Sequence, residues 1–205
     1  MNILHVDSSI MGEHSVSRKL TAAVVDRLVA LTPGATVVYR DVASEPLPQI
    51  YGALYAAAVG AGAPQRDTTV FEDAAVVNRA LDEVLGANVI VIGAPMYNFS
   101  IPSQLKSWLD ALAVPGKTFS YDANGAKGLL GDKRVIVASS RGNFYGPESP
   151  VASAEHHETY LRSFFGFLGV TQIEIVRAEG VKISPELAQT AVAAALEQAG
   201  QLKAA

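Results

Sequence analysis

Short apolar segments alternate with amphipathic ones along this chain, and that alternation constrains the fold more than any other feature. The most apolar run is residues 88–93, Asn-Val-Ile-Val-Ile-Gly, which predicts a central strand buried on both faces. Leucine and valine recur at helical spacing through residues 17–31, which predicts a helix that ends at Thr32-Pro33-Gly34. By the same criteria we expect strands at 3–7, 36–42, 88–93, 134–139 and 171–178, and helices at 17–31, 71–86, 102–112, 153–168 and 184–202.

Strands that are separated by helices pair in parallel through right-handed crossovers. The sequence therefore predicts an α/β protein with a doubly wound, five-stranded parallel sheet and helices on both faces. Its 205 residues contain no linker between two strand–helix sets, so we expect residues 1–205 to form a single domain. Residues 44–70, rich in Pro, Gly and Ala, predict a loop with one short helix, and the glycine-dotted residues 115–131 are assigned no element.

The composition excludes several classes of protein. Apolar residues make up 49% of the chain and charged residues 18%, which excludes intrinsic disorder. Sixteen basic residues against twenty acidic ones give a net charge of −4, so no nucleic-acid partner is expected. The absence of cysteine excludes disulfides, thiolate nucleophiles and cysteine-ligated zinc. Without a long apolar run or a basic start, the sequence predicts a cytoplasmic protein with no membrane partner and no secretory signal.

In a sheet of this kind, ligands bind beside the loops that leave the carboxyl ends of the strands. The first such loop, residues 8–17, is rich in serine and runs into a helix N-terminus, where free N–H groups and the helix dipole favour an anion. It matches neither the P-loop nor the Rossmann dinucleotide fingerprint. We interpret it as a site for a phosphate monoester held by hydroxyls and amides; the alternative is that Ser15 and Ser17 only cap the helix.

Two further loops follow the central strands. Met96, Tyr97 and Phe99 are large side chains at the end of a central strand and predict that a planar aromatic ligand stacks there. The alternative is that they fold back onto the core. The glycines of residues 139–146 allow the backbone to approach a ligand closely, with a plain surface turn as the alternative.

Four segments carry a resemblance to a known family: Ser8-Ser9 with Ser15 and Ser17, Ala-Pro-Met-Tyr-Asn-Phe at 94–99, Gln104-Leu105-Lys106, and Ser-Arg-Gly at 140–142. They resemble the FMN-dependent NADH:azoreductases, which are flavodoxin-like quinone reductases, and the likeness runs along nearly the whole chain. The resemblance implies a flavodoxin-like fold, FMN as cofactor and NADH or NADPH as hydride donor. It also implies quinone or azo acceptors, a two-electron ping-pong mechanism, and a homodimer in which the apolar segment 44–70 helps to wall the flavin pocket of the partner.

The resemblance also places the site. The family's FMN contacts fall on Ser9, Ser15, Val16, Ser17, Met96, Tyr97, Asn98, Phe99, Ser140, Arg141, Gly142 and Asn143. Residues expected to border the substrate pocket are Phe144, Tyr145, Tyr121 and Phe164. Val16 stands where the family often has glutamine, and Asn143 where it usually has a second glycine. Because hydride arrives and leaves at N5 of the flavin, no catalytic side chain is expected.

Other polar residues receive structural interpretations. His156 and His157 are adjacent rather than four residues apart, so no metal site is expected. Arg18 and Lys19 begin a helix and are interpreted as pointing to solvent. Two other functions stay open beside the enzyme: a flavodoxin-like FMN electron carrier without small-molecule turnover, and a regulatory domain that uses the pocket as a sensor. Such carriers are usually more acidic than −4 and lack a segment like residues 44–70.

Overall fold

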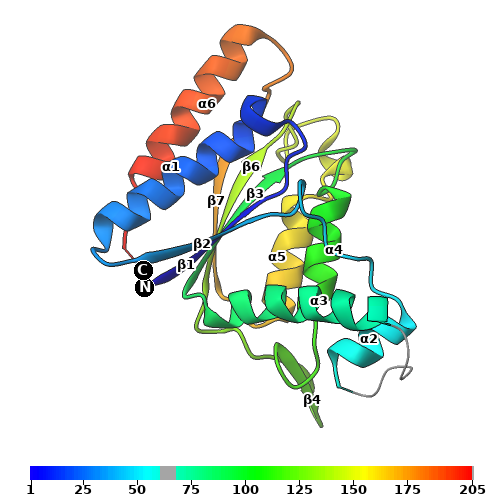
Figure 1. Ribbon diagram of the computed structural model, residues 1–205. Coiled ribbons are helices and arrows are strands. Elements are labelled where there is room, and N and C mark those ends of the chain that lie inside the picture. The colour runs from blue at the N-terminus through cyan, green and yellow to red at the C-terminus, as the bar shows by residue number, and fades with distance from the viewer. Residues whose placement is uncertain (61–67, 205) are drawn as a thin grey trace.

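A twisted sheet of five parallel strands forms the centre of the molecule (Figure 1). The computed structural model describes residues 1–60 and 68–204. Its strands are β1 (Asn2–Asp7), β2 (Thr36–Asp41), β3 (Val89–Pro95), β6 (Arg134–Ser140) and β7 (Gln172–Ala178), in the order β2-β1-β3-β6-β7. Every neighbouring pair is parallel, so the predicted α/β fold with a five-stranded parallel sheet is confirmed.

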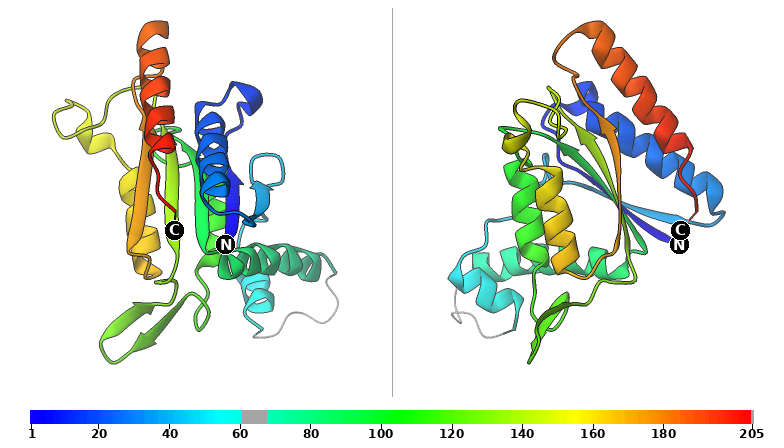
Figure 2. Two further views of the ribbon diagram at one scale, coloured as in Figure 1. Left: turned by 90° about the vertical axis from the view of Figure 1, so that its left-hand side faces the viewer. Right: turned by 180° about the vertical axis from the view of Figure 1, so that it is seen from behind.

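Helices cover both faces of the sheet (Figure 2). One face carries α1 (Val16–Leu31) and α6 (Pro185–Gly200), which pack against each other and on the central strands. The other face carries α3 (Thr68–Gly86), α4 (Ser103–Leu112) and α5 (Glu158–Phe167), with the short α2 (Gly52–Ala58) against α3. Strands β3 and β6 are buried along their whole length because both of their faces are covered. No helix in the described part of the chain is long and apolar enough to cross a membrane.

Two segments differ from the sequence prediction. The unassigned residues 115–131 contain an antiparallel hairpin, β4 (Phe119–Asp122) and β5 (Gly125–Gly128), which projects from the body of the molecule (Figure 1). The helix predicted at 153–168 begins only at Glu158, after a 3₁₀ turn at Ala152–Ala154. The carboxylate of Glu155 accepts hydrogen bonds from the N–H groups of His157, Glu158 and Thr159, so it supplies acceptors where the helix has none and fixes its start. The helix predicted within residues 44–70 is α2, and residues 61–67 of that segment lie outside the described residues.

Candidate functional site

The strands β1, β3, β6 and β7 end at one edge of the sheet, where their connecting loops meet. In the register of the sheet, Asp7 lies beside Gly93, Pro95 beside Ser140, and Ser140 beside Ala178. Hydrogen bonds then join the loops. The Ser8 hydroxyl donates to the Gly93 carbonyl (2.6 Å), and the Met96 N–H donates to the Ser140 carbonyl (2.8 Å).

The first loop brings a cluster of uncharged donors together at the start of α1. It contains a 3₁₀ turn, η1 (Gly12–His14), and then Ser15, whose hydroxyl accepts from the Arg18 N–H (3.2 Å) and so caps the helix. The same hydroxyl lies 3.1 Å from that of Ser17, and both side chains are buried. In the first turn the N–H groups of Val16 and Ser17 have no acceptor within the helix. Capping and anion binding are therefore compatible here, and the donor set fits a phosphate group.

The second loop turns sharply through two strained residues. Asn98 (φ 49°) and Phe99 (φ 72°) both adopt left-handed backbone conformations, which residues other than glycine rarely adopt. Two hydrogen bonds between Tyr97 and Ser100 close the turn, and the His156 N–H braces it by donating to the Phe99 carbonyl (3.0 Å). Strain of this kind, about 1–3 kcal/mol per residue, concentrates at ligand-binding positions.

Two cavities lie at this edge of the sheet, one beside the second loop and one beside the third. A cavity of about 590 Å³ lies beside the strained turn and reaches the start of α4; it is lined by Ile10, Tyr97, Asn98, Ser100, Ile101, Pro102, Ser103, Gln104, Lys106 and Tyr160. Another of about 430 Å³ lies under the loop that follows β6 and includes Asn143, Phe144 and Glu179 in its lining. The Phe99 ring, half of it exposed, meets Tyr145 edge-on with 6.4 Å between ring centroids.

The side chain of Arg141 points into the protein and not along the loop. It is 3% exposed, and its Nη2 lies 2.5 Å from Glu158, while its Nη1 lies 3.1 Å from Glu179. Glu155 contributes a third carboxylate at 3.7 Å. The Arg141 backbone is engaged as well, since its N–H donates to the Ala178 carbonyl (2.9 Å) and its carbonyl accepts from the Val181 N–H (3.2 Å); its buried Nε has no hydrogen-bond partner among the described residues.

Two buried groups beside Arg141 have strongly shifted pKa values. Burial and, after it, the positive charge of Arg141 lower the pKa of His157 to about 4, so the imidazole is neutral at pH 7. Burial raises the pKa of Glu158, but a hydrogen bond from Arg177 and the charge of Arg141 outweigh it and bring the pKa to about 2. Sequence reasoning missed this cluster because its members come from three separate elements.

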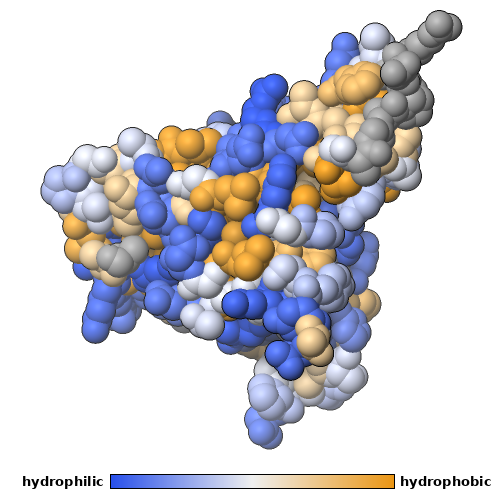
Figure 3. Space-filling model, turned by 90° about the horizontal axis from the view of Figure 1, so that it is seen from below, coloured by the Kyte–Doolittle hydropathy of each residue, from blue (hydrophilic) through white to orange (hydrophobic). Residues whose placement is uncertain are grey.

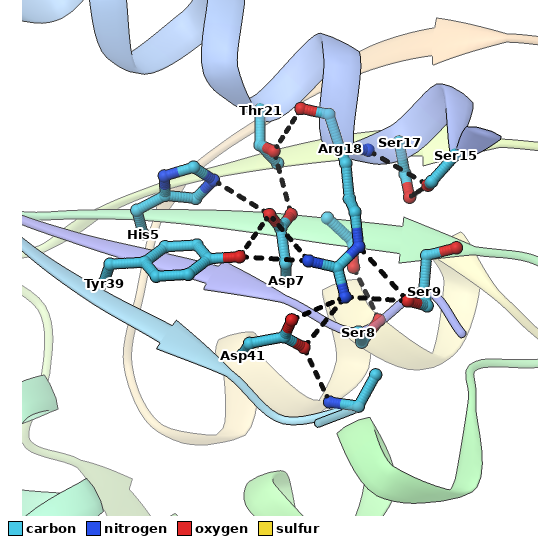
Figure 4. Close-up of polar contacts among 12 residues, drawn as sticks. His5, Asp7, Ser8, Ser9, Ser15, Ser17, Arg18, Thr21, Tyr39 and Asp41 are labelled. Atoms are coloured by element: carbon cyan, nitrogen blue, oxygen red, sulfur yellow. Dashed lines mark hydrogen bonds and ion pairs between the residues drawn. The ribbon is translucent and has the colours of Figure 1, made fainter. Parts of the chain in front are cut away.

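The Arg18 side chain is partly buried and turns back onto the protein, so the interpretation that it points to solvent is wrong (Figure 4). Its side chain lies across the ends of β1 and β2 and pairs with Asp41 at 2.8 Å. Lys19, the next residue, is exposed as expected. Tyr39 and Asp41 of β2 and Asp7 at the end of β1 carry polar groups that contact the guanidinium. The sequence signal that was available is a charged strand end next to the serine loop.

The remaining candidates lie in different places. The ring of Phe144 covers Gly180, at which an added Cβ atom would lie 2.8 Å from the ring. Phe164 lies on α5 between Tyr160 and Phe165. Tyr121, 70% exposed, lies on the β4–β5 hairpin, away from the three loops of its own chain (Figure 1). Within the described residues no group of three His, Asp or Glu side chains is arranged to hold a metal ion.

Comparisons with known proteins agree with this geometry. A family described by its flavodoxin-like fold matches residues 1–202. A protein of Bradyrhizobium diazoefficiens named FMN-dependent NADH:quinone oxidoreductase 2 is 53% identical over 205 residues, and all of both chains is covered. A protein of Methylorubrum populi named FMN-dependent NADH:quinone oxidoreductase is 52% identical, again over the whole of both chains.

Solved structures give the same result. An azoreductase from Bacillus anthracis is 33% identical with a TM-score of 0.88, over 98% of this chain and 97% of the other. An FMN-dependent NADH-azoreductase from the same species, solved in complex with FMN, is 26% identical with a TM-score of 0.84, over 98% and 99% of the two chains. The similarity thus extends over the whole sheet and all the loops at its carboxyl edge.

Proposed function

This chain belongs to the family with the flavodoxin-like fold, and from that premise we propose that it is an FMN-dependent NADH:quinone oxidoreductase that also reduces azo compounds. One observation of the structure carries the proposal: a cluster of uncharged hydrogen-bond donors and a strained, partly exposed aromatic turn meet at the same edge of the sheet. Phosphate and a planar ring are the two ends of FMN. Relatives that cover the entire chain bear the name of this activity.

The residues present fit FMN. Hydroxyls and amides of the loop that ends at α1 would hold the phosphate, with Ser9, Ser15, Val16 and Ser17 as its contacts. The ring would lie against Met96–Phe99 and against the backbone of Ser140–Asn143. When bound, FMN supplies the redox chemistry by accepting hydride from NADH and delivering it to the quinone or azo acceptor.

The role of the chain's own residues is to bind and orient the flavin ring and the planar substrates. The closed turn at Tyr97–Ser100 fixes the Asn98 N–H, our candidate donor to the ring edge, before any ligand arrives. Phe99, Phe144 and Tyr145 supply apolar surface on which a planar donor or acceptor can stack, and such stacking orients the reactants at short range. No side chain is assigned as a catalytic acid, base or nucleophile.

The purified protein tests the proposal directly. We expect it to be yellow, NADH to bleach the colour, and a quinone to restore it through many turnovers.

The double variant Ser9→Ala with Ser17→Ala tests the phosphate site. It should raise the dissociation constant of FMN about a hundredfold, because two hydrogen bonds to a charged group are lost, while the fold persists. A flavodoxin-type carrier would bind FMN without turning over quinone, and unchanged FMN affinity in the double variant would show that the serine loop is not the phosphate site.

We also propose that donor and acceptor use the same face in turn, which is a ping-pong mechanism. Phe99 and Tyr145 meet edge-on and frame a surface with room for one planar ring at a time. Initial rates plotted in reciprocal form against NADH at several quinone concentrations should give parallel lines. Intersecting lines would mean that both substrates bind together.

A homodimer completes the proposal. Apolar residues gather on the surface at the α2–α3 end of the molecule (Figure 3), where Tyr51, Tyr55 and Phe71 are each more than 40% exposed. In such a dimer Tyr121 would border the pocket of the partner rather than its own. Sedimentation at micromolar concentration should give twice the chain mass, and a monomer that retains FMN would contradict the proposal. We place the enzyme in the cytoplasm, where NADH is formed.

A further inference from the structure

Arg18 occupies a position where a positive charge is unfavourable. It is the third residue of α1, at the end of the helix where the dipole is positive. Its side chain is nevertheless held close to the protein, 17% exposed, and extends across the loop that follows β1 (Figure 4). An unfavourable charge in a nearly buried place calls for a specific set of partners.

Those partners accept hydrogen bonds from four of the five N–H groups of the guanidinium. Nε and Nη2 both donate to the carbonyl oxygen of Ser9, at 3.2 and 2.8 Å. Nη2 also donates to Asp41 (2.9 Å), and Nη1 donates to the Tyr39 hydroxyl (3.0 Å) and lies 3.6 Å from Asp7. An arginine has five N–H donors; four of those of Arg18 are hydrogen-bonded and the fifth, on Nη1, lies on the side of Asp7, so Arg18 influences a phosphate site chiefly through Ser9.

The charges around Arg18 also indicate that the guanidinium does not bind a phosphate directly. Asp7 and Asp41 place two carboxylates beside one guanidinium, so the cluster is not a cationic attractor for an anion. Burial raises the pKa of Asp7, but contacts with His5, Thr21 and Arg18 outweigh it, so the pKa lies below its usual value and the carboxylate stays charged. The cluster is arranged to hold Arg18 in one orientation.

Ser9 connects this cluster to the rest of the site. Its carbonyl oxygen, which would repel a phosphate if it faced one, is turned onto the guanidinium. Its hydroxyl lies 3.2 Å from that of Tyr97 and accepts from the Met11 N–H at 3.2 Å. The backbone that Arg18 holds through this carbonyl therefore carries the serine hydroxyl, which is held in turn by Tyr97 of the second loop and by the Met11 N–H.

We infer that Arg18 is a positioning residue for the phosphate-binding loop, residues 8–15, which its guanidinium holds through the carbonyl oxygen of Ser9. The inference rests on the proposed function, because it takes this loop to receive the phosphate of FMN. It assigns Arg18 a role at the cofactor site without contact between Arg18 and the cofactor.

The test compares FMN with riboflavin, which has the same ring and no phosphate. Both are titrated into the full chain after removal of flavin, and binding is followed by the quenching of flavin fluorescence. Arg18→Lys keeps the charge but loses the two-pronged contact with the Ser9 carbonyl. We expect the dissociation constant of FMN to rise about tenfold or more, and that of riboflavin to change less than about twofold.

Two further variants frame the result. Arg27→Lys, on the same helix, also breaks a bond from an arginine Nε to a carbonyl, that of Leu202, and should leave both affinities unchanged. Tyr39→Phe removes the hydroxyl that joins Arg18 to Asp7 and should weaken FMN alone, by about threefold. Thermal unfolding followed by circular dichroism shows which variants are folded.

Each outcome decides the question. Wild-type FMN affinity in Arg18→Lys would mean that charge alone suffices, and equal loss of FMN and riboflavin would mean that Arg18 supports the fold in general; either result overturns the inference. If Ser9→Ala with Ser17→Ala weakens FMN binding but Arg18→Lys does not, the phosphate site stands and only the role of Arg18 fails. If the serine variant keeps its FMN affinity, the proposed site itself is wrong.

Discussion

Replacing Arg141 by methionine is expected to lower the free energy of unfolding by about 3–5 kcal/mol at pH 7, because removing one partner of a buried ion pair leaves the other charge uncompensated. Arg141 is 3% exposed, and its guanidinium contacts Glu158 at 2.5 Å and Glu179 at 3.1 Å. Methionine fills similar space without a charge, so the loss measures electrostatics more than packing. Urea denaturation curves of both proteins give the difference.

The effect should depend on pH with a definite sign. The pKa of Glu158 is about 2 in the folded protein and 4.5 in the reference state, so its pairing stabilises the fold fully above pH 4.5 and is lost as the pH falls toward 2. Arg141→Met should therefore destabilise most above pH 4.5 and progressively less below it. Arg162→Met, which replaces an exposed arginine on the same helix as Glu158, serves as the control and should change stability by less than about 0.5 kcal/mol. A loss from Arg141→Met that does not vary with pH would contradict the electrostatic explanation.

Gly128→Ala is the second substitution with a large expected effect. A Cβ atom at Gly128 would lie 2.0 Å from the backbone nitrogen of Gly169 and 2.1 Å from the carbonyl carbon of Leu168. Both are backbone atoms, so no side chain can rotate out of the way, and the β4–β5 hairpin must separate from the turn that follows α5. We expect a loss of more than about 4 kcal/mol in the free energy of unfolding, or a failure to accumulate folded protein.

Another glycine provides the control for this substitution. Gly166 lies in α5 only three residues from Gly169, and a Cβ atom there would meet nothing within 4 Å. Gly166→Ala should stabilise the protein by about 0.5–1 kcal/mol, because alanine favours the helix. If Gly128→Ala is as stable as the wild type in denaturant curves, the hairpin does not dock on Gly169 in solution.

The local pattern of apolar residues was sufficient to predict the strands of the central sheet. Residues 88–93 and 134–139 are continuous apolar runs because strands covered on both faces need apolar side chains in both directions, and they are β3 and β6 of the structure. The loops at the carboxyl edge followed from the parallel topology, and the structure joins them through bonds such as that from Met96 to Ser140. The hairpin at 119–128 escaped prediction because its strands are four residues long and largely exposed, so they carry little apolar periodicity.

By itself, the sequence determined the order of strands and helices along the chain and the loops that meet at the carboxyl edge of the sheet, since each depends on neighbours along the chain. Only the tertiary structure decided where Arg18 and Arg141 point. An arginine side chain is long enough to reach solvent or a neighbouring element, and its direction depends on carboxylates and carbonyls that the fold brings near. The partners are Asp41 for Arg18 and Glu158 for Arg141, 23 and 17 residues away along the chain. Contacts over such separations exist only once the sheet has formed, so no local pattern encodes them.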